Sequence, residues 1–265
     1  MNLPAPGHLM LAFGLACGVA FAARTARALS VSGAVGAAVV GFLLFGLGGG
    51  RGATALLLFF VSSSALSRVG KKRKDALQFE KGGERDAGQV LANGGVAALC
   101  ALLLPTTNAL WPVAALLGAL ASANADTWAT ELGSLAKGKP RLITTFATAP
   151  TGSSGAISLP GTLAALAGAA FVAVVAFGGW GGGTVFLAAT LGGLGGALFD
   201  SLLGATVQAQ YRCTVCGKLT ERLTHCEQPT TLERGLAWLN NDWVNALSTL
   251  AGAVFAVLLW RILAR

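Results

Sequence analysis

Charged side chains are scarce in this chain. Only 11 % of its 265 residues are Asp, Glu, Lys or Arg, whereas soluble domains carry about 25 %. Hydrophobic residues make up 54 % of the chain, the mean hydropathy is +0.67, and apolar runs long enough to cross a bilayer recur from end to end. This composition excludes a soluble globular protein. It predicts an all-α, polytopic bundle of transmembrane helices that forms a single membrane domain over residues 1–265.

A basic segment before the first apolar run is also lacking, since residues 1–8 contain no Lys or Arg, and we expect no cleavable signal peptide. We therefore expect that run to be a span, and we predict seven or eight spans in all. The 37 glycines and many alanines suit closely packed membrane helices, since small side chains let backbones approach each other. The eight-span interpretation places the spans at roughly residues 9–23, 29–48, 52–67, 87–104, 110–128, 156–177, 184–207 and 243–262.

Basic residues are almost missing from one side of this predicted bundle. All but three of the 19 Lys and Arg fall in loops on the other side, the exceptions being Arg51, Arg261 and Arg265. The positive-inside rule makes the basic side cytoplasmic and both termini external, in the inner or plasma membrane of a prokaryote. Topology thus explains the net charge of +8, and no nucleic-acid partner is expected. The predicted cytoplasmic loops are residues 68–86, 132–155 and 208–242.

The first of these loops contains the basic run KKRK. We predict that Lys72 and Lys74 bind phosphate groups, although such a run also attracts anionic lipid head groups or simply sets topology. Farther along, Arg85, Gln89 and Asn93 lie at i, i+4 and i+8, on one helical face. Polar side chains in a span usually face the bundle interior or a cavity. We therefore predict a ligand-binding face, with interhelical hydrogen bonding of Gln89 and Asn93 as the alternative.

Residues 120–158 include acidic and polar side chains where a membrane helix rarely has them. Asn124, Asp126 and Glu131 fall in the first part of this stretch. Carboxylates bind Mg²⁺ together with substrate phosphate oxygens, and we predict that Asn124 binds the ligand beside them. Asp126 and Glu131 are five residues apart, about 140° around an ideal helix. They would approach one ion only if the helix ends or unwinds between them, or if one carboxylate serves a second ion. Gly133 is the expected helix end, and a buried pairing with Lys or Arg is the alternative role of the acids.

A glycine- and serine-rich loop follows the acidic helix end. It includes Gly152, Ser153 and Gly155, and it is preceded by Arg141 and Thr144. Glycines let backbone N–H groups approach a phosphate, and arginine adds bidentate charge-assisted bonds. The Walker A pattern G-x-x-x-x-G-K-[ST] is absent from the chain. The prediction of a phosphate site therefore depends on the position of this loop directly after the acidic residues.

More polar residues lie near the same predicted membrane face. Asp200 and Ser201 occur in a glycine-rich span, where an ionisable residue usually indicates function. We predict Asp200 as another Mg²⁺ ligand, and Asn241 and Asn245, four apart at the start of the last span, as inward-facing residues. One residue of the run NND is expected to cap that last helix.

The last cytoplasmic loop holds Cys213-x2-Cys216 and, eight residues later, adjacent His225 and Cys226. Three thiolates and one imidazole can form a closed tetrahedral zinc site. Reduced free thiols are the alternative, and a disulfide is not expected in a cytoplasmic loop. The sequence thus predicts a possible structural zinc ion.

Several runs from about Arg68 onward resemble the DUF92/TMEM19 family of integral membrane proteins and occur in the family's order. They are KGGERDAGQVLANGG, ANADTWATELG, PRLITTF, LFDSLLGATVQ, the Cys/His loop and NNDWVN. That family includes the phytyl-phosphate kinase of tocopherol and phylloquinone synthesis. More distantly, the chain is similar to CTP-dependent membrane enzymes such as phosphatidate cytidylyltransferase, archaeal CDP-archaeol synthase, and phytol and dolichol kinases. Their acidic helix end, glycine-bearing loop and Asp-Ser pair correspond here to Asp126, Gly152 with Gly155, and Asp200 with Ser201.

The resemblance implies an isoprenyl-phosphate kinase that transfers a phosphoryl group from a nucleoside triphosphate of the CTP type to phytyl or geranylgeranyl monophosphate. The expected partners are that lipid, the nucleotide, Mg²⁺ and membrane lipid. The expected catalytic residues are Asp126, Glu131, Asp200 and Arg85. A CTP-dependent nucleotidyltransferase that makes a CDP-lipid and a lipid or ion transporter are the alternatives. The mechanism requires four segments to meet in space, namely residues 85–93, 120–158, 200–208 and 240–245.

Overall fold

Helices dominate the structure. The computed structural model describes residues 4–69, 84–136 and 138–265. The helices are α1 (Pro6–Thr25), α2 (Val31–Arg68), α4 (Ala87–Ala101), α5 (Trp111–Gly133), α6 (Leu159–Ala173), α7 (Gly182–Thr206) and α8 (Asn241–Leu263), with short 3₁₀ helices η1 (Leu104–Thr106) and η2 (Val174–Gly178) after α4 and α6. Within the described ranges, six helical segments are long and apolar enough to cross a membrane.

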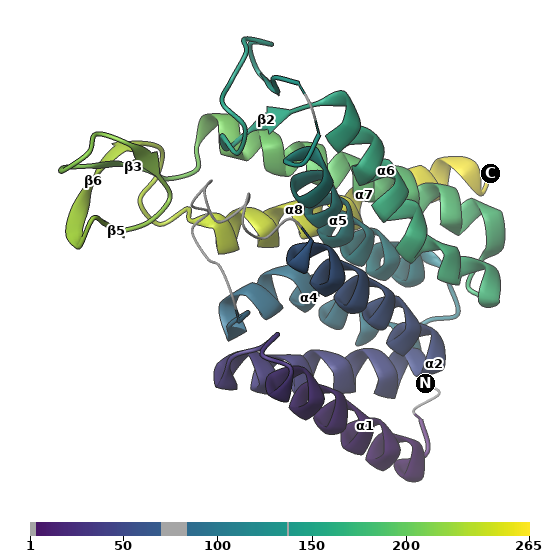
Figure 1. The fold of residues 1–265 in the computed structure, drawn as a ribbon. Helices are drawn as coiled ribbons and strands as arrows, with labels where there is room; N and C mark the ends of the chain where they lie inside the picture. The colour runs from purple at the N-terminus through teal and green to yellow at the C-terminus, as the bar shows by residue number, and fades with distance from the viewer. Residues whose placement is uncertain (1–3, 70–83, 137) are drawn as a thin grey trace.

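One of these six, α2, makes two passes. Its 38 residues exceed the roughly 20 needed for one crossing. Gly49 interrupts the helix with a φ of +61° and a ψ of −156°. The two halves then pack against each other: only a glycine at position 52 leaves room for the backbone oxygen of Leu44, and a Cβ at Gly41 would lie 3.9 Å from Leu56. α2 is therefore a helical hairpin (Figure 1).

The central helix is α5, which packs against α2, α4, α6, α7 and α8. Every residue from 112 to 125 is buried. α5 is not among the six apolar segments, because its last turns carry polar residues. Its 23 residues nevertheless extend about 34 Å, enough to span a hydrocarbon core of about 30 Å.

The predicted helical bundle is confirmed, and the six apolar segments give eight passes when α2 is counted twice and α5 is added. The eight predicted spans correspond to α1, the two halves of α2, α4, α5, α6, α7 and α8. An even number of passes puts both chain ends on one side of the bundle. Figure 1 shows N and C on one side and strands β3, β5 and β6 on the other. We call the end that carries these strands the loop face.

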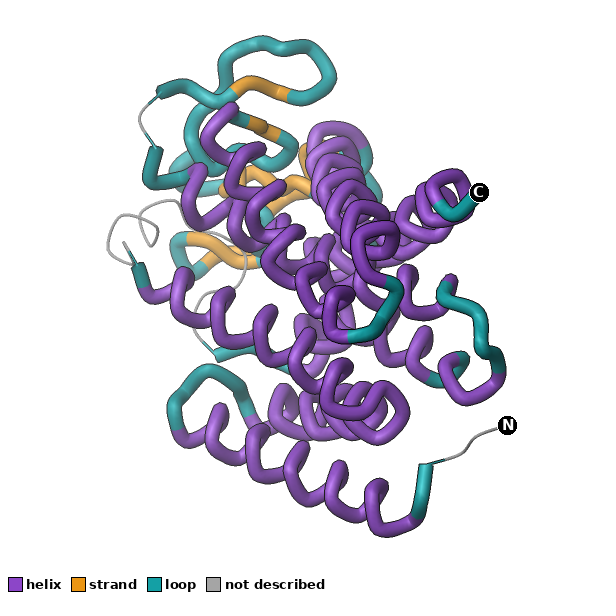
Figure 2. Tube along the Cα trace, turned by 90° about the vertical axis from the view of Figure 1, so that its right-hand side faces the viewer, coloured by secondary structure: helices purple, strands orange, loops and turns teal. Residues whose placement is uncertain are grey.

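Strands at the loop face were not part of the prediction, which was all-α. A two-stranded ribbon pairs β1 (Arg141–Leu142) with β2 (Ala156–Ile157), antiparallel. A four-stranded antiparallel sheet has the order β4-β3-β6-β5. Figure 2 draws these strands in orange, joined by the teal loops. The strands of the sheet are β3 (Gln210–Cys213), β4 (Leu219–Thr220), β5 (Thr224–His225) and β6 (Gln228–Arg234).

The four-stranded sheet is fixed to the end of α7 by Arg234. Its Nη2 donates to the backbone oxygen of Gly204 (2.9 Å), and its Nη1 donates to that of Ala205 (2.8 Å). The last carbonyls of a helix have no partner within the helix, and a cation near them is also favoured by the helix dipole. This cap holds the sheet close to the polar half of α7.

Candidate functional site

A cavity of about 340 Å³ lies at the loop face. It is lined by segments far apart in sequence: the start of α4, the last turns of α5, the loop before α6, the second half of α7 and the start of α8 all contribute. The four segments that the sequence analysis singled out thus meet in one place. The predicted site residues among its lining are Arg85, Gln89, Asp126, Glu131, Gly152, Ser153, Gly155, Asp200, Ser201 and Asn241.

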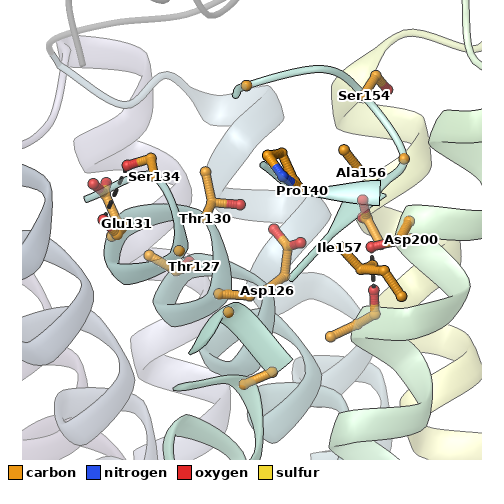
Figure 3. Close-up of a pocket in the computed structure, with 18 of the residues that line it drawn as sticks. Asp126, Thr127, Thr130, Glu131, Ser134, Pro140, Ser154, Ala156, Ile157 and Asp200 are labelled. Carbon is orange, nitrogen blue, oxygen red and sulfur yellow. Dashed lines mark hydrogen bonds between the residues drawn. The ribbon is translucent and has the colours of Figure 1, made fainter. Parts of the chain in front are cut away.

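Asp126 and Asp200 form the acidic centre of the cavity. They come from α5 and α7, and Figure 3 shows both carboxylates directed into the same space. They are close enough to repel each other electrostatically. The Oδ2 atom of Asp200 is buried without a hydrogen-bond partner, and a buried acceptor without a partner is costly unless a ligand completes it. Two facing carboxylates with an incomplete shell are suited to a divalent cation.

Glu131 lines the same cavity but does not face Asp126. α5 continues without interruption to Gly133, the helix end predicted from the sequence. The helix therefore neither ends nor unwinds between the two acids, and they remain on different sides of α5 (Figure 3). Glu131 Oε1 accepts a hydrogen bond of 2.6 Å from Ser67 on α2. Of the three predicted Mg²⁺ ligands, the geometry groups only Asp126 with Asp200.

Arg85 provides the positive charge of the cavity. Its backbone bridges to Leu29, with Arg85 N donating to Ala28 O and Ser30 N donating to Arg85 O. Burial lowers the pKa of this guanidinium from its ordinary value, while the negative charge of Glu131 raises it. Arginine stays charged nonetheless, and Arg85 makes no ion pair with a described residue.

The contacts that Arg85 does make are weak. Its Nη1 lies 3.5 Å from Ser64 Oγ, and its guanidinium carbon lies 5.8 Å from the ring centre of Phe60. A buried cation is costly unless an anion accompanies it. Arg85 is thus poised for an anionic ligand such as a phosphate group.

The glycine- and serine-rich loop is pinned to α7 beside Asp200. Gly155 has a φ of +77° and sits against the backbone of Ala205, where a Cβ would collide with it. Ser154 Oγ donates to Gln208 Oε1 at 2.7 Å and lies 3.2 Å from Gly204 O. The loop therefore follows a fixed path along the cavity wall, as a phosphate-binding loop requires.

The start of α4 holds Gln89 in position through a capping box. Asp86 Oδ1 accepts from Gln89 N at 3.0 Å, and Gln89 Oε1 accepts from Asp86 N. At the start of α8, Asn240 is the cap, accepting from Trp243 N. Asn241, the next residue, lines the cavity.

Several predicted binding residues lie away from this cavity. Arg141 is exposed, and its Nη1 donates to Phe146 O at 2.8 Å. Thr144 is exposed on the same ribbon, and Asn245 lies one turn beyond the cavity on α8. The ribbon projects Arg141 and Thr144 outward, so the geometry does not group them with the acids. Lys72 and Lys74 lie outside the described residues.

Asn124 was predicted to bind the ligand, but its position is a structural one. The side chain is fully buried. Its Oδ1 accepts from Ser62 and Ser63, and its Nδ2 donates to Gly168 O at 2.7 Å. These bonds join α2, α5 and α6, which is how a polar residue inside a membrane bundle is usually satisfied. Asn124 is therefore already fully engaged between helices.

Glu221 is a cavity residue that the sequence reasoning missed. It follows β4 in the four-stranded sheet, lines the cavity, and interacts electrostatically with Asp200. No motif marks it, since it comes from an irregular segment between two short strands. Only the docking of the sheet onto α7 brings it to the site.

A second cavity, of about 410 Å³, lies within the bundle between α1, α2 and α4. Arg85, Gln89 and Thr127 line both cavities, so the two adjoin. Asn93, predicted as a ligand-binding residue, faces this second cavity, and its Nδ2 donates to Gln89 O. The other lining residues are almost all apolar: Leu15, Ala16, Val19, Ala20, Ala23, Leu29, Ala37, Val40, Gly41, Phe45, Gly50, Ala53, Leu56, Leu57, Phe59, Phe60, Val90 and Gly94.

The four residues of the predicted zinc site gather in the four-stranded sheet. The ligand atoms of Cys213, Cys216, His225 and Cys226 all lie within 4.8 Å of one another. This cluster is separate from the acidic cavity, since none of the four residues lines it.

Comparison with known proteins places the chain among membrane proteins. A family model described as "Integral membrane protein DUF92" matches residues 14–253. The chain is 34 % identical to Protein PGR of Arabidopsis thaliana over 88 % of this chain and 89 % of that protein. It is 32 % identical to the uncharacterized membrane protein MJ0933 of Methanocaldococcus jannaschii, over 96 % and 94 %.

A third relative is more distant. Protein VTE6, chloroplastic, of Arabidopsis thaliana is 28 % identical over 87 % of this chain and 65 % of that protein. No solved structure matches the chain. The family model covers most of the chain, and relatives above 30 % identity extend over nearly all of it. The chain therefore belongs to the DUF92 family of integral membrane proteins.

Proposed function

We propose that this chain is an isoprenyl-phosphate kinase, which transfers the terminal phosphoryl group of a nucleoside triphosphate to an isoprenyl monophosphate. One observation carries the proposal: a polar cavity with acidic and basic groups adjoins an apolar cavity inside the bundle, and the two share Arg85, Gln89 and Thr127. A substrate with a phosphate head and a hydrocarbon tail fits such a pair. The resemblance to a family that includes phytyl-phosphate kinase supports the same proposed function.

The polar cavity would hold the phosphate groups. Arg85 would bind the phosphate of the lipid, because this partly buried residue has no ion pair with a carboxylate among the described residues and lies where the cavities adjoin. The backbone N–H groups of the loop at Gly152 and Gly155 would approach the nucleotide phosphates. Asp126 and Asp200 would hold Mg²⁺, which when bound neutralises charge on the triphosphate.

The apolar cavity would hold the isoprenyl chain. Its wall comes from α1, α2 and α4, and its polar rim is formed by Arg85, Gln89 and Asn93. Burial of the chain there removes apolar surface from water and leaves the phosphate at the rim. A lipid held at both ends has its reacting oxygen in a fixed position. Such positioning of the reactants accounts for much of the rate acceleration in phosphoryl transfer.

The reaction balances without a strong general base. An anionic oxygen of the lipid monophosphate forms a bond to the γ-phosphorus, and the bond from that phosphorus to the bridging oxygen breaks. The nucleoside diphosphate leaves with the electron pair, and the product is the isoprenyl diphosphate. The attacking oxygen is already ionised, so the chain's task is positioning and stabilisation of charge.

We further propose that the loop face, and with it the site, is cytoplasmic. The loops at this end contain most of the basic residues of the chain, and positive loops remain on the cytoplasmic side. Nucleoside triphosphates are available on that side.

Two positions of radioactive label test the reaction. The purified chain in lipid nanodiscs is incubated with Mg²⁺, phytyl or geranylgeranyl monophosphate, and CTP, ATP, GTP or UTP. Label in the γ-phosphate should appear in the isoprenyl diphosphate, with release of nucleoside diphosphate. Transfer of α-label into lipid, with release of pyrophosphate, would instead identify a nucleotidyltransferase. Absence of label transfer from all four nucleotides would overturn the proposal.

A further inference from the structure

The small sheet at the loop face has the donors of a metal site. Besides the mutual distances within 4.8 Å, His225 Nδ1 lies 3.2 Å from Cys226 Sγ and 3.6 Å from Cys216 Sγ. All three cysteines are free thiols. We infer that Cys213, Cys216, His225 and Cys226 bind one Zn²⁺ ion in a closed, structural site that stabilises the sheet.

The distances match a tetrahedral zinc ion. Zn–S bonds of about 2.3 Å and Zn–N bonds of about 2.0–2.1 Å put neighbouring ligand atoms about 3.5–3.8 Å apart in a tetrahedron. The two N–S separations of 3.6 and 3.2 Å are close to this range, and all the ligand atoms lie within 4.8 Å of one another, so binding requires side-chain adjustments that draw the four ligand atoms together. Three soft sulfur donors with one imidazole favour zinc over magnesium or calcium. Four protein ligands leave no open position, which is the mark of a structural rather than a catalytic site.

The first pair of ligands is arranged by a tight turn after β3. The N–H groups of Val215 and Cys216 point to Cys213 Sγ at 3.4 and 3.5 Å. Gly217 N donates to Cys213 O, and Gly217 closes the turn with a φ of +71°. Two N–H donors directed at a sulfur stabilise a thiolate, the form in which cysteine binds a metal.

The second pair is unusual because its two ligands are adjacent in sequence. The turn from β5 to β6 explains how both reach one point. His225 pairs with Gln228 across the hairpin, and the two turn residues, Cys226 and Glu227, have φ values of +52° and +60°. Non-glycine residues seldom adopt this conformation. Here it turns the Cys226 thiol back toward the imidazole of His225.

The sheet has little else to hold it together. Its strands are two to seven residues long, and most of its side chains are exposed, Cys213 and Tyr211 being among the few buried ones. Small units without a sizeable core usually depend on a metal or a disulfide. A zinc ion would supply that link directly across the ends of β3, β5 and β6.

Metal analysis of the intact chain tests the inference. The protein, purified in detergent with zinc in the growth medium, should contain one zinc ion per chain. The variants Cys216→Ser and Cys226→Ser should lose it. The double variant Cys17→Ser/Cys100→Ser, altered only within α1 and α4, should keep it. Zinc retained by both single variants, or lost equally in the control, would overturn the site.

A second measurement works even where a variant fails to fold. Cobalt exchanged into the unmodified chain should give the visible absorption of a tetrahedral ion together with sulfur-to-cobalt charge-transfer bands. An octahedral spectrum without those bands contradicts the site. Mass spectrometry after thiol alkylation completes the test. Two outcomes would disprove the zinc site: a disulfide between Cys213 and Cys216, or purified protein that contains no zinc and whose thiols are all alkylated. None of these readouts depends on the proposed kinase activity.

Discussion

At the scale of single residues, the carboxylates of Asp126 and Asp200 matter most to the proposed chemistry. We expect Asp126→Asn and Asp200→Asn each to lower the rate of phosphoryl transfer by at least about 100-fold, because each removes a negative charge that would hold the cation next to the triphosphate. The γ-label assay measures the effect. Glu233→Gln is the matched control, since Glu233 is an exposed acid paired with Arg212 on the sheet. Full activity of Asp126→Asn would contradict the mechanism.

Glu131 lines the same cavity as Asp126 and Asp200 but has different neighbours. Glu131 accepts a hydrogen bond from Ser67, and its charge acts on Arg85 only through space, without a direct contact. The three predicted acids thus lie at two places in the cavity, Asp126 with Asp200 and Glu131 apart from them.

Asn124 leads to a prediction about stability instead of chemistry. Replacement by Ala removes its hydrogen bonds to Ser62, Ser63 and Gly168, and with them the polar link between α2, α5 and α6. We expect a loss of about 1–3 kcal/mol in stability, seen as a lower Tm of the detergent-solubilised protein. Asn108→Ala, in an exposed turn, should leave Tm unchanged. Equal Tm values for the two variants would contradict a structural role of Asn124.

At the scale of elements, the loop from β1 to α6 must lie directly on α7. Gly155→Ala should displace this loop, because the added methyl group meets the backbone of Ala205 and because a φ of +77° disfavours alanine. We expect a decrease of phosphoryl transfer of about 10-fold or more, with the nucleotide KM raised.

Gly138→Ala is the control for this loop variant. Gly138 also has a positive φ, of +127°, but no atom lies within 4 Å of its added Cβ. Strain without a collision should leave the loop on α7 and change activity much less. If both alanine variants behave alike, contact between the loop and α7 is not what matters.

At the scale of the whole molecule, the two cavities should select the substrate together. Ala53 lines the apolar cavity, and Ala53→Phe would fill part of it. We expect KM for phytyl monophosphate to rise several-fold while a short prenyl monophosphate is affected little. Product formation at varied lipid concentration measures this. Ala22→Phe, on the exposed side of α1, should have no effect, and a similar loss for short and long chains would argue against a tail in this cavity.

The topology of the molecule gives a further prediction. Alkaline phosphatase fused after Arg265 should be active in a bacterial host, because eight passes and a cytoplasmic loop face place the C-terminus outside. Green fluorescent protein fused to a chain shortened at Glu227, within the sheet, should fluoresce. The reverse pattern would place the proposed site on the wrong side for cellular nucleotides.

The sequence by itself determined the membrane character and the approximate number of spans, because these follow from local composition. It also singled out Asp126, Asp200 and Arg85, since an ionisable residue in or beside a span is costly enough to stand out. The Gly133 helix end and the capping of α8 by the NND run were likewise readable from local signals. The same sequence did not predict the strands of the loop face, because most of them have only two to four residues and the longest, β6, does not alternate between buried and exposed side chains.

Only the tertiary structure decided which polar residues share a site. Asn124 and Asp126 are two residues apart in sequence, yet one is sealed between three helices and the other faces the cavity. The rotation of α5 within the bundle sets that difference, and local spacing does not contain it. Glu221 enters the cavity through docking of the sheet onto α7, and the apolar cavity exists because α2 folds back at Gly49. Long-range packing fixes each of these positions.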